Sequence, residues 1–432
     1  MTGKLAILGG PKAVTLEDGD LFDWPIITAE DEEAVMTVLR ARGMSNTDVT
    51  QAFEAEFAAW HDVDYALAFN NGTAALHTAM WACGVRRGDE VIAPGMTFWA
   101  SCTPAMSLGA TVVFADIERD TLCLDPNDIE HRITDRTRAI IPVHFGGHPA
   151  DMDPIMAIAR RHGLKVIEDA SHAHGALYKG RTAGTIGDVG CFSVMSRKAL
   201  AIGEGGIFIT NDREIYERGV LFADQSRHDT LTIPELAAMK GLPVGGVKYR
   251  MHQLSSAVGR VQLRHYRERM QEIQRAMNYF WDLLADVPGI KAHRPPADSG
   301  STMGGWYASR GLYRAGELAG LPLERFCEAV LAEGTMTRAG ANDPLHLQPL
   351  YQTIDVFGDG QPTSIAFADR DARAPAGSLP NAEAIRQIAC RVPWFKHCRS
   401  RQIEQHAQAF RKVAESADQL LCDETHEDGS AG

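Results

Sequence analysis

The chain has 432 residues, 45% of them hydrophobic and 23% charged, and a formal net charge of −13 at pH 7, which together predict a soluble globular protein of two or more domains. The acidic balance argues against nucleic acid or an anionic membrane surface as a partner, and no apolar run approaches the roughly 20 residues that span a bilayer. Eight cysteines without a CxxC pair, and a first segment unlike a signal peptide, predict reduced thiols, no metal site and a cytoplasmic location.

The chain begins with an expected arm and an expected helix. Residues 1–27 show little periodicity and are predicted to form an N-terminal arm, in which the pair Trp24-Pro25 stands out. Thr28 begins a capping pattern, so a helix is predicted over residues 28–43.

Strand and helix patterns then alternate. The helical pattern at 154–162 has Asp153 as its expected N-cap and Gly163 just past its end. Alternation at this spacing predicts a mostly parallel sheet with helices on both faces, and hence an α/β large domain over residues 28–264. The expected strands are residues 65–69, 90–93, 110–114, 139–143, 165–167, 189–195 and 206–210.

A long helical pattern over about residues 253–284 leads out of this domain. The rest, residues 265–422, is expected to form a smaller α+β domain closed by an amphipathic helix. Within it, residues 359–378 are rich in Gly, Pro, Asp and Ala and are expected to form a long loop, either a lid or a mobile insertion. Residues 423–432 are acidic and are expected to form a disordered tail.

The segment CFSVMSRKALAIGEGGIFIT, residues 191–210, places one lysine between two apolar runs. Lys198 follows the first run, and a cluster of glycines leads into the second. Glycine lacks a Cβ, so backbone around such a cluster can approach a flat ligand closely. A lysine taken by itself is most often solvated, whereas this pattern is typical of a buried amine presented to a cofactor carbonyl.

An acidic strand end upstream decides between the two interpretations. The strand predicted at 165–167 ends in Glu168 and Asp169. Enzymes that use pyridoxal phosphate (PLP) need a carboxylate at the pyridine nitrogen, because only the protonated ring withdraws electrons effectively. The carboxyl ends of strands are also where open α/β sheets bind ligands. We therefore expect Asp169 to meet the ring nitrogen and Lys198 to form a Schiff base with PLP.

The runs EDASHAHGA, residues 168–176, and FSVMSRKALAIGEGG, residues 192–206, resemble the motif pair of the DegT/StrS-type aminotransferases. These are fold-type I PLP enzymes that aminate keto sugars and keto cyclitols. The resemblance implies an α/β large domain with a mostly parallel, seven-stranded mixed sheet between helices, plus a smaller C-terminal α+β domain. It also implies a PLP-dependent aminotransferase in which Lys198 acts as the base that moves the donor's α-proton.

The run NNGTAAL, residues 70–76, follows an expected strand and opens an expected helix. The backbone N–H groups of Gly72 and Thr73 would then bind the PLP phosphate at a helix N-terminus, and the run is similar to the family's SGTAAL motif. The resemblance makes the Ser193 hydroxyl a second phosphate ligand. A buried serine bonded to neighbouring backbone is the alternative.

Two further cofactor contacts are implied by the resemblance. Phe98 falls where the family places the aromatic ring that stacks on the pyridine, with Trp99 as the alternative. His172 falls near the cofactor hydroxyl, where many members have glutamine, and His174 could instead be a core residue.

The segment GVKYRM, residues 246–251, is similar to the family's GxNxRM segment, which reaches the phosphate of the neighbouring subunit. The resemblance therefore implies a homodimer with shared active sites, although Lys248 stands where asparagine is common. Lys248 and Arg250 are both candidates for this contact, and a basic pair on the surface is the alternative.

The resemblance also implies the substrates. Glutamate or glutamine is the expected amino donor, and a keto sugar or a keto cyclitol is the expected acceptor. The pair Trp24-Pro25 is similar to the subset that acts on inosose-type cyclitols, and an N-terminal segment held by one buried indole is the alternative. The candidates for acceptor recognition are His144, Trp306, Tyr307 and His346, with core packing as the alternative for Trp306 and Tyr307. Arg338 is a candidate for binding a donor carboxylate or a substrate phosphate, with a surface role as the alternative.

A PLP-dependent sugar dehydratase and a non-catalytic regulator are the alternative functions. Dehydrating relatives replace the lysine by histidine, so Lys198 argues against the first. A regulator would be expected to have lost Asp169, Lys198 or Ser193, and all three are present.

Overall fold

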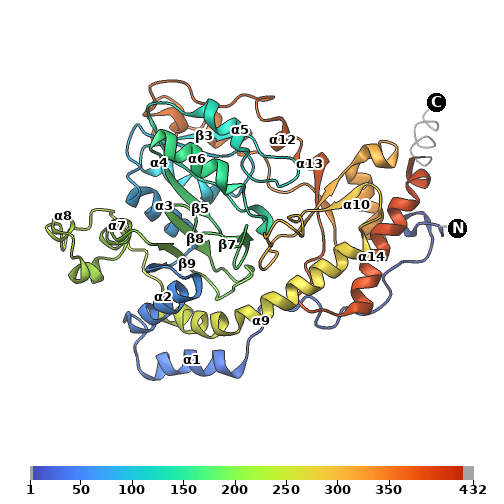
Figure 1. The fold of residues 1–432 in the computed structure, drawn as a ribbon, viewed down its shortest axis with the longest axis horizontal. Coiled ribbons are helices and arrows are strands. Elements are labelled where there is room, and N and C mark those ends of the chain that lie inside the picture. The colour runs from blue at the N-terminus through green and yellow to red at the C-terminus, as the bar shows by residue number, and fades with distance from the viewer. Residues whose placement is uncertain (1–2, 422–432) are drawn as a thin grey trace.

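A seven-stranded sheet lies at the centre of the larger lobe (Figure 1). Its strands are β1 Tyr65–Phe69, β2 Glu90–Pro94, β3 Thr111–Ala115, β4 Thr137–Ile140, β5 Lys165–Asp169, β8 Val189–Ser193 and β9 Gly206–Thr210. Their spatial order is β1-β9-β8-β5-β4-β2-β3, and only β9 runs antiparallel to its neighbours within this sheet. The predicted mostly parallel mixed sheet is confirmed. The computed structural model describes residues 3–421, so the tail expected at 423–432 lies outside the described residues.

Helices cover both faces of this sheet, as the alternation of strands and helices predicts. Successive strand residues point to opposite faces. Leu67 packs in the hydrophobic cluster that contains α3 (Gly72–Ala82) and α7 (Arg213–Ala223). The preceding Ala66 packs in a separate cluster with α2 (Asp48–His61). Both faces of the sheet are therefore covered by buried apolar side chains.

The predicted capping pattern begins helix α1 (Ala29–Arg40). The N–H of Thr28 donates to the Asp31 carboxylate at 2.9 Å, and the Thr28 side chain meets the third helical residue in return. The chain also has short helices and a small hairpin: α4 Pro104–Ser107, α5 Pro126–Ile129, α8 Pro234–Ala237, α11 Pro349–Gln352, α12 Pro380–Glu383 and α13 Ile385–Ile388, with the hairpin strands β6 Leu177–Tyr178 and β7 Arg181–Thr182.

The predicted N-cap of the helix before β5 is wrong. Helix α6 (Met152–His162) has Asp151 as its N-cap, two residues earlier than expected, whereas its end at Gly163 with φ 64° is as predicted. The carboxylate of Asp153 instead forms ion pairs with the exposed Lys179 and Arg181 of a nearby hairpin. The Asp153 side chain, which the local sequence predicted as the N-cap, is therefore used in tertiary ion pairs.

Helix α9 (Gln253–Leu283) runs from the larger lobe into the smaller one (Figure 1). The smaller lobe holds an antiparallel sheet of order β10-β11-β13-β12. No helix within residues 3–421 combines the length and the apolar character needed to cross a membrane. The elements of this lobe are β10 Ile290–Ala292, β11 Arg310–Tyr313, α10 Leu323–Ala332, β12 Arg338–Ala339, β13 Ala389–Arg391 and α14 Ser400–Glu415.

The N-terminal arm packs against the smaller lobe. Leu5 and Leu21 are fully buried in the core of that lobe. The buried carboxylate of Glu333 accepts hydrogen bonds from the N–H groups of Ala6 at 2.8 Å and Ala13 at 2.9 Å. The arm is thus held along its length before it reaches Trp24.

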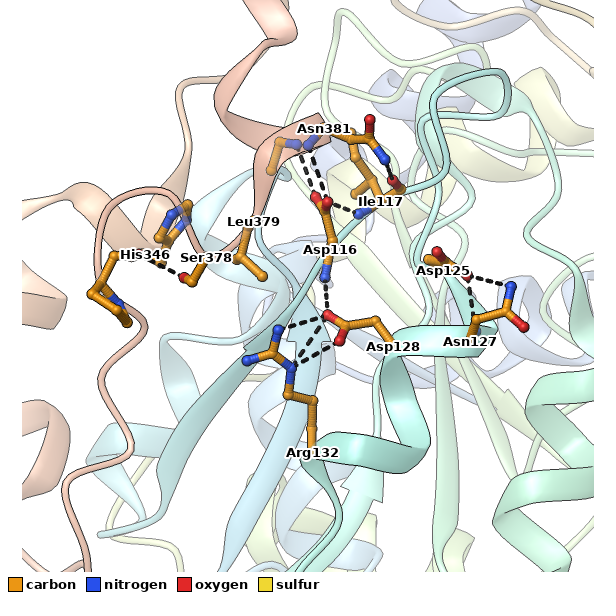
Figure 2. A network of polar contacts seen from close by, with 12 residues as sticks. Asp116, Ile117, Asp125, Asn127, Asp128, Arg132, His346, Ser378, Leu379 and Asn381 are labelled. Carbon is orange, nitrogen blue, oxygen red and sulfur yellow. Dashed lines mark hydrogen bonds and ion pairs between the residues drawn. The ribbon is translucent and has the colours of Figure 1, made fainter.

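A segment of the predicted smaller domain is fixed to the larger lobe beside β3 (Figure 2). The Asp116 carboxylate accepts hydrogen bonds from the first N–H groups of α12, those of Asn381 at 3.0 Å and Ala382 at 2.9 Å. Asp128 accepts from the N–H of Asp116 at 2.8 Å and forms an ion pair with Arg132. A carboxylate at a helix N-terminus meets its unsatisfied N–H groups, so Asp116 anchors this segment.

The loop expected at 359–378 lies along the same side of the larger lobe. Arg370 donates to Glu90 at 2.9 Å, and the Arg87 guanidinium lies 4.1 Å from the centre of the Phe367 ring. These contacts place the loop on the sheet edge near β2 and β3. The division of the chain into domains at residues 264 and 265 stays a prediction.

Candidate active site

A cavity of about 610 Å³ is lined by the larger lobe, the smaller lobe and the N-terminal arm. Residues that lie far before and far after Lys198 in the sequence meet in this cavity. The lining includes these residues expected from the sequence: Gly72, Thr73, Phe98, Asp169, His172, Ser193, Lys198 and Tyr307.

Lys198 lies in the loop between β8 and β9 and is 8% exposed. Burial lowers the pKa of its amine to about 8, although the nearby Asp169 carboxylate acts in the opposite direction. Its Nζ lies 4.1 Å from the centre of the Tyr307 ring. The indole Nε1 of Trp24 donates to the Lys198 carbonyl at 2.9 Å, so the N-terminal arm helps to hold the lysine loop.

Asp169 is the last residue of β5 and is buried. Its Oδ2 accepts from the Ser101 hydroxyl at 2.7 Å, and its Oδ1 accepts from the Ser171 N–H at 3.1 Å. Because the Ser101 hydrogen is directed to Asp169, the Thr97 hydroxyl 3.0 Å away donates to Ser101. A chain of hydroxyl groups therefore orients the carboxylate.

The neighbouring carboxylate, Glu168, points to the opposite face of the sheet. It is fully buried and accepts from the N–H groups of Gly184, Ile186 and Gly187 and from His144 at 2.9 Å. Burial opposes ionisation, but these donors outweigh it and lower the pKa of Glu168. Of the two carboxylates that end the predicted strand, only Asp169 lines the cavity.

The N-terminus of α3 forms the polar end of the cavity. Asn71 caps this helix by accepting from the Ala74 N–H at 2.8 Å, which leaves the N–H groups of Gly72 and Thr73 without a hydrogen-bond partner among residues 3–421. A Cβ at Gly72 would lie 2.7 Å from the Cβ of Ser193. Only glycine therefore lets the helix end approach Ser193 so closely.

Phe98 and His172 also line the cavity. Phe98 lines the cavity with 49% of its surface exposed, whereas Trp99, 45% exposed, does not line it. The Gly146 N–H donates to Nδ1 of His172 at 3.3 Å, and burial holds the pKa of His172 well below its usual value. The His172 ring is therefore neutral and carries its proton on Nε2.

Three of the expected substrate residues are buried outside the cavity lining. His144 accepts from the Ala150 N–H at 3.0 Å through Nδ1, so its Nε2–H donates to Glu168. His346 is bonded to Glu383 at 3.0 Å, and Trp306 is buried in the core of the smaller lobe.

The expected basic residues also lie outside the lining. Arg338 is exposed on β12. Arg250 forms an isolated bridge with Phe69, and its side chain donates to Ser226 at 3.3 Å. Lys248 precedes it in the same segment, which passes close to the strand leading to α3. Neither Lys248 nor Arg250 is part of the cavity wall of its own chain.

The structure adds cavity residues that sequence reasoning missed. Ser101 could have been found as a hydroxyl residue in the run that follows β2. Arg391 is a lone charge in an otherwise apolar run of residues 388–395, which is an unusual place for a cation. Ser171, Arg197 and Glu204 lie within the two motif runs but were not singled out as site residues. Further lining residues come from separate elements and gave no local signal: Phe22, Thr97, Arg310, Asn342, Trp394 and Lys396.

These residues fit PLP. Asp169 offers an ionised carboxylate to a ring nitrogen, Lys198 offers a buried amine, and the end of α3 with Ser193 offers donors to a phosphate. Within residues 3–421, no three His, Cys, Asp or Glu side chains gather in a way that could hold a metal ion.

Comparisons with known proteins agree with this fit. The model of the DegT/DnrJ/EryC1/StrS aminotransferase family matches residues 25–410. The chain is 34% identical over 393 residues to a putative L-glutamine:3-amino-2,3-dideoxy-scyllo-inosose aminotransferase of Micromonospora echinospora, covering 89% of this chain and 90% of that protein. It is 32% identical over 397 residues to the dTDP-3-amino-3,4,6-trideoxy-alpha-D-glucose transaminase of Streptomyces venezuelae, covering 91% and 94%. An aminotransferase structure from Psychrobacter cryohalolentis matches with a TM-score of 0.80 and 28% identity, covering 92% and 100%.

Proposed function

Since the chain belongs to the DegT/DnrJ/EryC1/StrS aminotransferase family and is a PLP-dependent aminotransferase of fold type I, we propose that it transfers the amino group of glutamine or glutamate to a keto sugar or a keto cyclitol. The observation that supports this most is that the Lys198 amine and the Asp169 carboxylate line one cavity. When bound, PLP supplies an electron sink at the substrate carbon and carries the amino group between the two substrates.

Lys198 is suited to move the proton in this reaction. Its lowered pKa leaves a useful fraction of free amine near neutral pH, and its position against the Tyr307 ring keeps the amine away from bulk water. The Trp24 indole fixes the backbone of the same loop. Lys198 therefore supplies both the anchoring amine and the general base.

Asp169 is suited to hold a proton on a ring nitrogen. The Ser101 hydroxyl and the Ser171 N–H orient its two oxygens. Phe98 would cover one face of a flat ring, and the neutral His172 would offer an Nε2–H donor at its edge. The N–H groups of Gly72 and Thr73, with Ser193, would bind the phosphate.

We also propose a homodimer with shared active sites, in which Lys248 or Arg250 reaches the partner's phosphate. Exposed apolar side chains in the same region support this, because Leu242 is 54% and Val244 is 39% exposed. Light scattering of the eluting protein tests the assembly. Elution as a monomer with full activity would contradict it.

The experiment that tests the function uses the protein loaded with PLP. Addition of L-glutamine or L-glutamate is expected to change the absorption spectrum of the bound cofactor, and a matching keto acceptor is expected to restore it. A panel of nucleotide-linked keto sugars, keto sugar phosphates and free keto cyclitols then identifies the acceptor. A spectrum that neither donor changes would refute the proposed transamination.

A further inference from the structure

The chain enters the smaller sheet through a corner with unusual backbone, residues 303–308, which lies just before β11. Trp306 with φ 57° and Ala308 with φ 53° both adopt the left-handed conformation, which is unfavourable for residues other than glycine. Trp306 is also buried, and its Nε1 has no hydrogen-bond partner among residues 3–421. Costs of this kind gather where a side chain must be held in one place for function.

Close packing holds this corner against the lysine loop. A Cβ at Gly305 would overlap the Cβ of Ala199, the residue that follows Lys198. The Gly305 N–H donates to the His174 carbonyl at 3.2 Å, and the Gly305 carbonyl accepts from the Trp394 indole at 3.0 Å. The position of the corner is therefore set by the same loops that carry the reacting groups.

Tyr307 is the residue between the two left-handed positions, and its ring lies in the cavity. The Lys198 Nζ lies 4.1 Å from the centre of this ring. Trp394 packs edge-on against the ring at 5.6 Å, and the His172 ring lies 4.6 Å from it. The Tyr307 hydroxyl forms no hydrogen bond within the described part of the chain. The face of the ring, and not the hydroxyl, is thus the part of Tyr307 that meets the amine.

An aromatic face favours the charged form of an amine. The π-electrons attract an ammonium group, whereas a neutral amine gains little from them. Burial acts in the opposite direction on Lys198 and disfavours its ammonium form. A general base must take up a proton and release it again, so its cation needs moderate stabilisation. A ring face provides this without the tight ion pair that a carboxylate in direct contact would form.

The other charged and titratable groups near this amine come from several elements. The Asp169 carboxylate at the end of β5 also favours the ammonium form of Lys198. Burial lowers the pKa of His174 to about 3 and holds that of His172 well below its usual value, and the pKa of Arg310 is about 10. These three side chains therefore keep one charge state near pH 8. The cations that act on Tyr307 are Arg197, Arg310 and Arg391.

We propose that Tyr307 is a positioning residue for the proton transfer by Lys198: the face of its ring holds the amine and stabilises the ammonium that forms when the amine takes up a proton. The corner at residues 303–308 keeps the ring in this position. The sequence predicts Tyr307 as a candidate for acceptor recognition, whereas contact with the amine serves the reactions of both substrates. This inference rests on the proposed function, because it assigns a role in the proton transfer of the same site.

The titration of Lys198 in the apo-protein tests the contact without PLP. Tyr307→Leu keeps an apolar side chain beside the amine but removes the ring. The proton affinity of Lys198 is then expected to fall about 10-fold, so the midpoint of amine labelling should move down by about one pH unit. Tyr307→Phe keeps the ring and is expected to retain the midpoint within about 0.3 pH units. Tyr307→Met, which also lacks a ring, should behave like Tyr307→Leu.

The direction of the shift decides between two roles of the ring. An unchanged or raised midpoint in Tyr307→Leu and Tyr307→Met would mean that the ring only excludes water, and it would overturn the proposal. An equal fall in Tyr307→Phe would assign the effect to the hydroxyl and would overturn it as well. Tyr279→Leu is the matched control, because it removes a tyrosine of α9 that donates to Glu404 outside the cavity, and the midpoint should not change.

The PLP-loaded enzyme provides the second measurement. The single-turnover rate with L-glutamine or L-glutamate is expected to fall about 10-fold in Tyr307→Leu and by no more than about 2-fold in Tyr307→Phe, with little change in the donor concentration that gives half the maximal rate. A loss seen only as a higher KM for the acceptor would return Tyr307 to acceptor recognition and overturn the proposal. If no donor reacts with wild type, the proposed function fails, whereas the midpoint in the apo-protein still tests the contact between ring and amine.

Discussion

The large sheet and the smaller sheet differ in whether their charged side chains have partners within the protein. In the large sheet, Asp169 at the cavity and Glu168 on the opposite face each accept several hydrogen bonds, and the buried His144 beside Glu168 has a partner at both ring nitrogens. On the wall formed by the smaller sheet, Arg310 and Arg391 lie side by side without a carboxylate among the described residues. Charged side chains with partners in the protein are held in place without a ligand, whereas charged side chains without such partners are free to bind an anionic ligand.

Replacement of the reacting amine is expected to have the largest effect on activity. Lys198→Ala removes the group that both anchors the cofactor and moves the proton, and transamination is expected to fall by about 10⁴-fold or more. The measurement is the steady-state rate with glutamine or glutamate and the acceptor found in the panel. Unfolding temperature is the control, since the variant should remain folded. Turnover close to that of wild type would remove Lys198 from the mechanism.

The lowered pKa of Lys198 gives a pH dependence that is measurable without PLP. With a pKa of about 8 in place of the usual 10.5, the free-amine fraction of Lys198 near neutral pH is expected to exceed that of an exposed lysine by roughly 300-fold. Labelling of the apo-protein by an amine reagent, followed by mass spectrometry, should show a midpoint near pH 8 at this position.

The sign of the linked stability follows from the same shift. Below pH 8 both the folded and the unfolded states hold the proton on Lys198, and between about pH 8 and the unfolded value only the unfolded state does. This group therefore makes the apo-protein more stable as pH rises through that window. A labelling midpoint equal to that of the exposed Lys12 would contradict both statements.

Loss of the buried Glu168 charge in the large sheet is expected to destabilise the fold strongly. Glu168→Gln removes the carboxylate that accepts three backbone N–H bonds and the His144 bond, and disruption of such a buried network costs about 3–5 kcal/mol. Denaturant unfolding of the apo-protein measures the change. Glu204→Gln, which alters an exposed carboxylate without a bonded partner among residues 3–421, is the matched control and should unfold like wild type.

The hydroxyl chain behind Asp169 is expected to have an intermediate effect. Ser101→Ala removes one donor to the carboxylate, a hydrogen bond to a charged group worth about 1.5–3 kcal/mol, so kcat is expected to fall about 10- to 100-fold with little change in KM. The pH at which the bound cofactor changes its spectrum should shift as well. Thr97→Val, one hydroxyl further away, should give a smaller change of the same kind. Equal kcat in wild type and Ser101→Ala would show that Asp169 needs no such support.

The smallest predicted effect concerns the smaller sheet, where removal of a charge is expected to raise the stability of the protein and not to lower it. Arg391→Gln relieves repulsion from Arg310 and Arg338 and is expected to stabilise the protein by about 0.2–1 kcal/mol. Thermal unfolding at low salt measures it, and added salt should reduce the difference. A clear loss of stability in this variant would mean that the arginine is matched after all.

Local sequence was sufficient where one short run contains a complete unit of chemistry. The strand-to-helix run around Gly72, the acidic strand end at Asp169 and the lysine loop at Lys198 each lie within about ten residues, and each lines the cavity. The sequence predicted site residues less accurately where their contacts come from distant segments of the chain. His144, Trp306 and His346 are buried in other contacts, because their partners come from separate segments.

The sequence by itself determined the strand and helix alternation, and with it the mostly parallel sheet whose edge presents Asp169 and the glycine-rich helix start. Apolar periodicity and capping residues act over a few positions, so they can be read in order along the chain. Only the tertiary structure decided that Arg310, Arg391 and Lys396 face this edge together with Trp24. Their meeting depends on how the smaller sheet and the N-terminal arm pack against the larger lobe, and no local pattern encodes such long-range packing.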